Sequence, residues 1–231
     1  MKNKGQTFAR TLGSVLQLDT RMMATLTGVQ VAVWALTVGI LAVVDGDARS
    51  DPPVLFLGLP GIFTVCAGVI LLFIEGMQQF NMDFVVLINF GIARRRALQV
   101  SWVAVLGYGV VTTALSAALE AFWYFVLTGG QGDGFLCRIP AWGWLCLALM
   151  PAALSALAVG VLRRFGAKGG LVLWLSFMVL CQLPQLLEIT SKDALELLVE
   201  ILPVFLPLVG LAAAIAGTVL LYRDNAAVTN R

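Results

Sequence analysis

Six long apolar runs, separated by short polar stretches, constrain this chain more than any other feature. They cover residues 22–44, 54–74, 98–127, 142–162, 171–187 and 202–222. A helix needs about 20 apolar residues to cross a bilayer, and each run has that length or falls slightly short of it. The runs are continuous, whereas a membrane β-barrel shows alternating segments of about ten residues. The sequence therefore predicts an all-α membrane protein with six transmembrane helices.

The composition agrees with a chain that uses the bilayer as part of its solvent. Hydrophobic residues make up 60% of the chain and charged residues 12%, whereas soluble domains have about 25% charged residues. Histidine is absent, which removes the commonest general base and the commonest metal ligand. The sequence also lacks a phosphate-binding loop, paired carboxylates and a Ser/His/Asp set. We therefore expect no catalytic, metal or cofactor site on this chain, and no nucleic-acid partner.

The distribution of basic residues predicts the orientation. Cytoplasmic loops of membrane proteins are enriched in Lys and Arg. With the N-terminus inside, 12 of the 15 basic residues fall inside, namely Lys2, Lys4, Arg10, Arg21, Arg94, Arg95, Arg96, Arg163, Arg164, Lys168, Arg223 and Arg231. We therefore expect a multi-pass protein of the plasma membrane with both termini in the cytoplasm.

The polar segments that flank the runs predict two further helices. Residues 1–21 carry apolar residues at helical spacing, which favours an interfacial helix on the inner membrane surface. The stretch "TSKDALELLVE", residues 190–200, has a candidate N-cap in Ser191 and predicts a short external helix before the sixth span. We interpret residues 1–231 as a single transmembrane domain, in which a six-span bundle (22–222) precedes a cytoplasmic tail (223–231).

The stretch "NMDFVVLINFGIARRRAL", residues 81–98, is typical of neither a loop nor a span. It is too apolar for a free loop and too short to cross a bilayer, and three arginines stand near its end. Read as a helix, it places Phe84, Leu87, Ile88 and Ile92 on one face, and Gly91 is a natural terminator. We expect a short cytoplasmic helix whose apolar face is covered by the membrane surface or by a groove on another protein.

Glu120 is the one acidic residue placed well inside a predicted span. Ionisable groups inside membranes often line a polar pathway, so Glu120 is a candidate pathway residue. The alternative is an interfacial role, because Trp123 and Tyr124 are close by and the carboxylate could extend to the outer headgroup layer. The sequence does not separate these two interpretations.

Two stretches resemble segments of a known protein family. "FVVLINFGIARRRAL", residues 84–98, is similar to the cytoplasmic coupling segment of small type-2 ATP-binding-cassette (ABC) exporter permeases, where an apolar run leads into a Gly-x-x-Arg-Lys/Arg turn. "LRRFGAKGGLVL", residues 162–173, looks like the basic connector that these permeases carry between spans four and five. The six spans and the two flanking helices agree with the same architecture. Ala93 departs from the Thr or Ser that many relatives have before the basic pair.

The resemblance implies a permease subunit that is not itself an enzyme. Two such halves, either two copies or one copy and a paralogue, would face each other above two separate ATPase subunits that hold ATP and Mg. The coupling helix of each half would lie in a groove on an ATPase. Our hypothesis for its contact residues is the set Phe84, Leu87, Ile88, Phe90, Ile92 and Arg94.

The spans offer few polar groups, which favours an amphipathic or hydrophobic cargo over a sugar or an ion. We expect an exported peptide, because small permeases of this type resemble parts of peptide export or self-immunity systems. The alternative is a non-transporting membrane scaffold or sensor that docks a soluble partner at the same segment. An intramembrane enzyme is disfavoured by the absence of histidine and paired acids, and a secondary transporter by the absence of matching broken helices in two halves.

Overall fold

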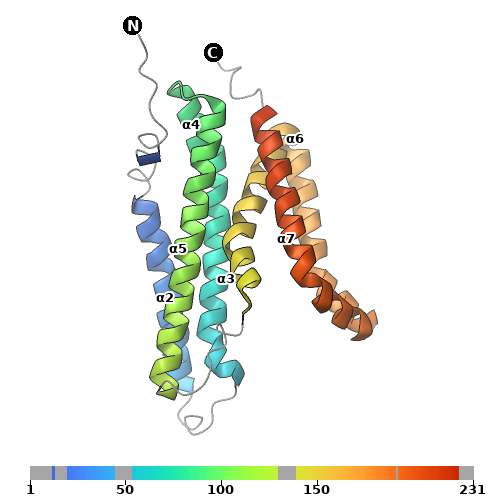
Figure 1. Cartoon of the computed structure of the whole chain (residues 1–231). Helices are drawn as coiled ribbons and strands as arrows, with labels where there is room; N and C mark the ends of the chain where they lie inside the picture. The colour runs from blue at the N-terminus through green and yellow to red at the C-terminus, as the bar shows by residue number, and fades with distance from the viewer. Residues whose placement is uncertain (1–11, 14–19, 45–53, 130–138, 191, 224–231) are drawn as a thin grey trace. The chain divides into compact units, whose positions relative to one another are not determined.

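The computed structural model describes residues 12–13, 20–44, 54–129, 139–190 and 192–223. These residues are helical apart from short turns and contain no strand (Figure 1), so the predicted all-α fold is confirmed. In chain order the elements are α2 (Thr20–Val44), α3 (Val54–Gln78), the π-helical turn η2 (Gln79–Asp83), α4 (Phe84–Asn89), α5 (Arg94–Thr128), α6 (Ala141–Thr190) and α7 (Lys192–Arg223).

Five helices within these ranges are long and apolar enough to cross a membrane, which indicates a multi-pass membrane protein. The candidate spans are Met22–Val43, Gly58–Asn89, Arg94–Val126, Ala141–Val179 and Pro203–Arg223. A helix suits such sequences because it pairs its backbone N–H and C=O groups within the segment, where lipid offers no partners. The predicted interfacial helix (1–21) and the predicted tail (223–231) lie almost entirely outside the described residues.

The helix α6 contains both the fourth and the fifth apolar run, which the sequence predicted as separate helices. Gly166 interrupts it with non-helical dihedrals, φ 57° and ψ −140°. A Cβ built at Gly169 would lie 2.9 Å from the carbonyl oxygen of Val161. In a continuous helix, residues eight apart are separated by about 12 Å along the axis. The chain therefore reverses at Gly166, and α6 consists of two segments that fold back on one another at this corner.

The helix α3 continues into α4 through the π turn η2, whereas the sequence predicted a separate short helix after the second span. Gln78, Asp83 and Phe84 all keep right-handed helical dihedrals across the junction. Neither Gly nor Pro stands between Met77 and Phe90, so nothing in the sequence breaks the helix there. The prediction of an isolated coupling helix is therefore wrong in this respect: α4 is the last part of a long helical segment.

Gly91 ends this long segment, as its position in the sequence predicts. Its φ of 82° lies in the left-handed region, where a side chain would be strained. The N–H of Gly91 donates to the carbonyl of Ile88 at 2.9 Å, and the N–H of Ile92 donates to that of Leu87 at 3.1 Å. These two bonds form a Schellman motif, which satisfies carbonyls that the helix end leaves without partners.

The helix α7 includes residues 192–200, which the sequence predicted as a separate external helix. It is continuous from Lys192 to Arg223, with Pro203 and Pro207 inside it. Each proline removes a backbone donor and bends a helix. Figure 1 accordingly shows the N-terminal part of α7 turning away from the line of its C-terminal part.

The chain divides into two compact units. Unit 1 comprises Met1–Glu75 and Trp102–Pro151, and unit 2 comprises Gly76–Ser101 and Ala152–Arg231. Glycine residues permit close packing of helices in each unit, as is common among membrane helices. In unit 1 a Cβ at Gly109 of α5 would overlap the carbonyl oxygen of Ala148 in α6. In unit 2 a Cβ at Gly217 of α7 would lie 2.6 Å from the backbone nitrogen of Leu157 in α6.

Candidate functional site

The segment that the sequence singled out for partner contact lies in unit 2 and has one buried and one exposed side. Phe84 is fully buried and Leu87 is 7% exposed, so these two pack within the chain. Ile88, Ile92 and Arg94 are partly exposed. Phe90 stands out, with 80% of its surface exposed at the start of the turn. Of the six predicted contact residues, Phe90 is the one that the fold leaves most open.

The exposed side of this segment carries two further apolar residues that sequence reasoning missed. Met82 is 62% exposed and Val86 is 45% exposed. Together with Phe90 they follow a spacing of four residues, which places side chains on one helical face. We call Met82, Val86 and Phe90 the apolar stripe. The signal for it was present in the sequence, but the larger apolar face through Phe84 and Leu87 obscured it.

Arg163 of α6 contacts the other side of the segment, at Asn81 and Phe84. Its Nε donates to Oδ1 of Asn81 at 3.2 Å, and its Nη2 donates to the same oxygen and to the backbone carbonyl of Asn81. Its Cζ also lies 5.8 Å from the centroid of the Phe84 ring, within cation–π range. The two stretches that the sequence singled out, 84–98 and 162–173, are thus joined through one arginine.

Arg94 has a role inside the chain as well. Its Nη1 donates to the carbonyl of Tyr222 at 3.0 Å. Tyr222 lies in the last turn of α7, where backbone carbonyls have no partner within the helix. Arg94 therefore caps α7 and ties the start of α5 to it.

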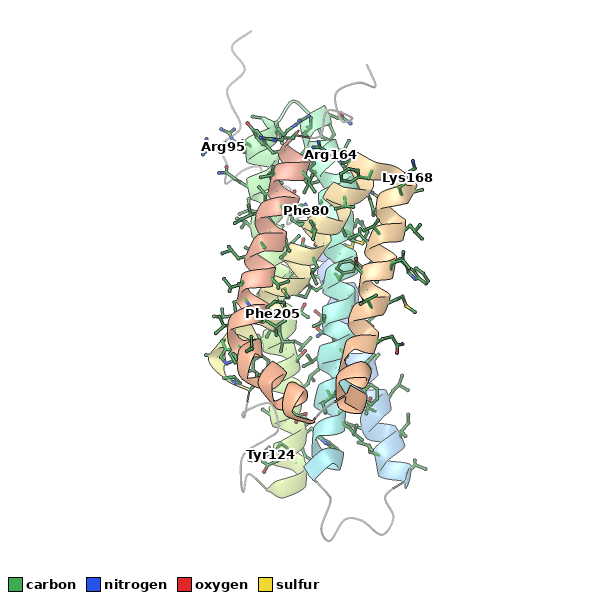
Figure 2. The ribbon with its side chains drawn as sticks, turned by 90° about the vertical axis from the view of Figure 1, so that its right-hand side faces the viewer. Phe80, Arg95, Tyr124, Arg164, Lys168 and Phe205 are labelled. Atoms are coloured by element: carbon green, nitrogen blue, oxygen red, sulfur yellow. The ribbon has the colours of Figure 1, made fainter. Side chains whose placement is uncertain are left out.

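The same end of unit 2 is basic. Arg95, Arg164 and Lys168 are exposed there, and Figure 2 shows all three gathered at one end, with Phe80 further along the bundle. Phe90 is exposed in the turn that precedes Arg95, so the end of the apolar stripe lies close in sequence to positive charge. Such a combination suits an apolar groove with an acidic rim, or lipid phosphates.

A second feature, in unit 1, is a buried polar network between α2 and α5. Gln30 is fully buried, and its Nε2 donates to Oγ of Ser116 at 3.0 Å and to the carbonyl of Thr112 at 3.3 Å. The Ser116 hydroxyl donates to the same carbonyl at 3.0 Å. A Cβ at Gly68 of α3 would overlap the Gln30 amide, so glycine makes the room that this side chain occupies. Nothing in the sequence reasoning had identified Gln30.

Glu120, the candidate pathway residue, lies one turn beyond Ser116 on α5 and is 2% exposed. A Cβ at Gly61 of α3 would overlap its carboxylate, so the side chain packs into the α3–α5 interface. The backbone N–H of Gly61 lies within reach of this carboxylate, and no side chain among the described residues donates to it. The structure thus places the carboxylate between α3 and α5, and its role in a polar pathway stays a prediction.

A small cavity lies beside this network within unit 1. It has room for about one water molecule, at about 10 Å³. Its lining comes from α3, α5 and α6 and consists of Val65, Val69, Thr112, Thr113, Ser116, Trp144 and Leu147. Among the described residues, no group of His, Cys, Asp and Glu side chains is arranged to hold a metal ion.

Comparison with known proteins does not identify a family. No protein-family model, no curated protein and no solved structure matches the chain.

Proposed function

We propose that this chain is the membrane-spanning subunit of an ATP-driven exporter of the type-2 ABC kind. In this proposal both segments of α6 cross the plasma membrane, which gives six spans with both termini in the cytoplasm. The chain is a permease and not an enzyme, because a separate ATPase subunit binds ATP and Mg. The observation that carries the proposal is the apolar stripe, held at a basic end by Arg163.

The stripe needs a cover, because three large apolar side chains that face water are unfavourable. In the proposed orientation the basic end faces the cytoplasm, as the positive-inside rule favours. A groove on an ATPase subunit covers Met82, Val86 and Phe90, and acidic residues on its rim pair with Arg95 or Arg164. The buried residues Phe84 and Leu87 then act as positioning residues for the stripe.

The same segment offers a route for motion into the membrane. Since α4, η2 and α3 are consecutive helical elements with no interruption, a displacement at Phe90 is passed along the backbone into the second span. The π turn lies within this route, and such turns are frequent at functional sites. Nucleotide binding need only shift an equilibrium between two states that differ by a few kcal/mol.

The cargo in this proposal is an amphipathic or hydrophobic molecule, with a peptide as the best candidate. A second copy of the chain, or a paralogue, completes the pathway. Apolar residues dominate the exposed surface of the described spans, which suits contact with lipid and with a second permease half.

The proposal is tested by purifying the full-length chain in mild detergent and identifying the proteins that accompany it. We expect a phosphate-loop ATPase of about 200–300 residues, the size of one or two domains, whose ATP hydrolysis responds to the permease. Phe90→Ala should reduce its recovery. Phe165→Ala is the matched control, because Phe165 is also exposed at the basic end of unit 2. A stable companion without nucleotide binding would favour the scaffold alternative and overturn the exporter proposal.

A further inference from the structure

We propose that the corner of α6 in unit 2, residues 164–168, binds the headgroup of an anionic phospholipid. Arg164 and Lys168 contact the phosphate of the lipid, and its acyl chains lie against Phe165 and Leu171. This inference goes beyond the proposed function, because it applies whether the chain takes part in export or serves as a scaffold.

The corner is an exposed and tight reversal of the chain. All five residues from Arg164 to Lys168 are exposed. The direction changes at Gly166, whose φ of 57° lies in the left-handed region. A Cβ built at Gly169 would lie 2.9 Å from the Cβ of Phe165, so the two segments of α6 are already in close contact next to the reversal. Arg164 and Lys168 therefore flank a single short turn, at the end of the molecule that Figure 2 shows.

Neither cation of the corner is used for a contact with another charged or polar group of the chain. No hydrogen bond or ion pair joins Arg164 or Lys168 to any other residue in the part of the chain that the structure describes. Arg164 lies over the ring of Phe165, with its Cζ 5.8 Å from the centroid, whereas Arg163 donates to Asn81. The N–H donors of Arg164 and Lys168 thus remain available for a phosphate.

The neighbouring sequence supplies positive charge without acidic residues. Residues 152–187 contain three cations and no acid, and residues 84–101 contain three more cations and again no acid. Asp83, just before the second of these stretches, already interacts within the chain. Glu188 follows Gly166 by 22 residues, which corresponds to about 33 Å of helix.

The acidic residues of α7 are also far from the corner. The first segment of α6 and α7 run in the same direction, because Gly217 packs against Leu157 and Gly160 packs against Leu220. Glu200 precedes Gly217 by 17 residues, or about 25 Å of helix, while the corner lies beyond Gly160 in the other direction. Electrostatic interactions in physiological salt are screened over about 8 Å. The opposite charge at the corner therefore has to come from outside these helices.

Exposed apolar residues next to the cations favour a lipid as the source of that charge. Phe165 is 56% exposed and Leu171 is 57% exposed. Leu171 follows Lys168 by less than one helical turn, about 5 Å along the axis. The stretches 152–162 and 171–187, on the two sides of the corner, contain no charged residue and suit the bilayer interior. So short a corner keeps its cations at the headgroup layer, where lipid phosphates are the nearest anions.

The chemistry of the two side chains predicts a preference among lipids. A guanidinium pairs with two oxygens of one phosphate, and an ammonium adds a second, compact positive charge. A phosphatidylcholine headgroup brings its own positive charge, which opposes a second cation at the same phosphate. Phosphatidylglycerol has no such group, so the corner should select lipids with a net negative charge.

The test uses the full-length chain, with any subunit that accompanies it, purified in detergent. It is titrated with dioleoyl phosphatidylglycerol and, separately, with dioleoyl phosphatidylcholine, which has the same acyl chains and no net charge. Native mass spectrometry counts the bound lipids. We expect tighter binding of phosphatidylglycerol, weakened about fivefold in Lys168→Gln and about 30-fold in the Arg164→Gln/Lys168→Gln double variant. Lys168→Arg keeps the charge and should bind like the unaltered protein.

Arg95→Gln is the matched control, because Arg95 is another exposed cation of unit 2 and its loss changes the net charge equally. It should leave the affinity for phosphatidylglycerol nearly unchanged, and all variants should elute as single species in gel filtration. Equal affinity for the two lipids, or equal losses in Arg95→Gln and Lys168→Gln, would overturn the inference.

A second measurement identifies what covers the corner. Lys168 is acylated with a water-soluble reagent in nanodiscs, and Lys192 at the start of α7 is the internal reference. We expect slower acylation of Lys168 in phosphatidylglycerol than in phosphatidylcholine nanodiscs, whether or not another subunit is present. Protection that requires an ATPase and is independent of the lipid would overturn this inference and leave the proposed function intact. Failure to recover an ATPase would contradict the proposed function without affecting the lipid result.

Discussion

The guanidinium of Arg163 lies over the ring of Phe84, with its Cζ 5.8 Å from the ring centroid. The same side chain donates to the Oδ1 of Asn81 at 3.2 Å. One residue of the basic connector in α6 therefore fixes both the π turn η2 and the first turn of α4. This contact and the burial of Phe84 and Leu87 hold one face of the segment inside unit 2, while the apolar stripe stays exposed.

Arg163→Gln should loosen the segment and lower the free energy of unfolding by about 1–2 kcal/mol, because it removes hydrogen bonds of about 1 kcal/mol each and an exposed cation–π contact. Thermal unfolding in detergent, together with hydrogen exchange at residues 79–90, measures the effect. Arg164→Gln is the control, since Arg164 is exposed beside Phe165 and should change little. Equal losses for the two variants would show that Arg163 does not hold the segment.

Gly91→Ala should destabilise the end of α4 by about 1–2 kcal/mol, since a Cβ at a φ of 82° is strained. Gly28→Ala in α2 is the control, because open space surrounds that position and its φ is not positive. It should be neutral or slightly stabilising. If Gly91→Ala proves as harmless as Gly28→Ala in thermal unfolding, the Schellman motif does not contribute to stability.

Gly61→Ala should cost about 1–3 kcal/mol as an overpacking change, because the new methyl group overlaps the Glu120 carboxylate. The cost should largely disappear in a Glu120→Ala background, where the methyl group has room. A double-mutant cycle from unfolding free energies measures this coupling, which we expect to exceed about 1 kcal/mol. Additive effects would contradict the packing of Glu120 against Gly61.

The helical class of this protein could be predicted from the sequence because the apolar runs are long and continuous. The positions at which one helix ends and the next begins were harder to predict. The second span was predicted to end at Ile74, where polar residues begin, yet the helix continues through Glu75 and Gly76 and ends only before Gly91. Polar residues alone do not end a helix whose backbone bonds are already propagating.

The candidate sites, too, could be predicted from the sequence only in part. Phe84 and Leu87 have the strongest apolar pattern, and that pattern marks burial as readily as partner contact. The pairing of Arg163 with Asn81 joins residues 82 positions apart, and no local pattern predicts it. Likewise, the many glycines of the sequence do not reveal that Gly61 is the one opposite Glu120. Such relationships depend on how helices pack, which sequence periodicity does not specify.

Site-specific photo-crosslinking at the apolar stripe tests the central proposal most directly. A benzophenone side chain is placed at position 82, 86 or 90 of the full-length chain in native membranes, and the crosslinked products are identified by mass spectrometry. Position 177, an exposed Phe in the second segment of α6, is the control and should crosslink to lipid or to a second permease half. The exporter proposal predicts that all three stripe positions crosslink to one phosphate-loop ATPase. Crosslinks from the stripe to lipid alone, or to a protein without a nucleotide site, would contradict it.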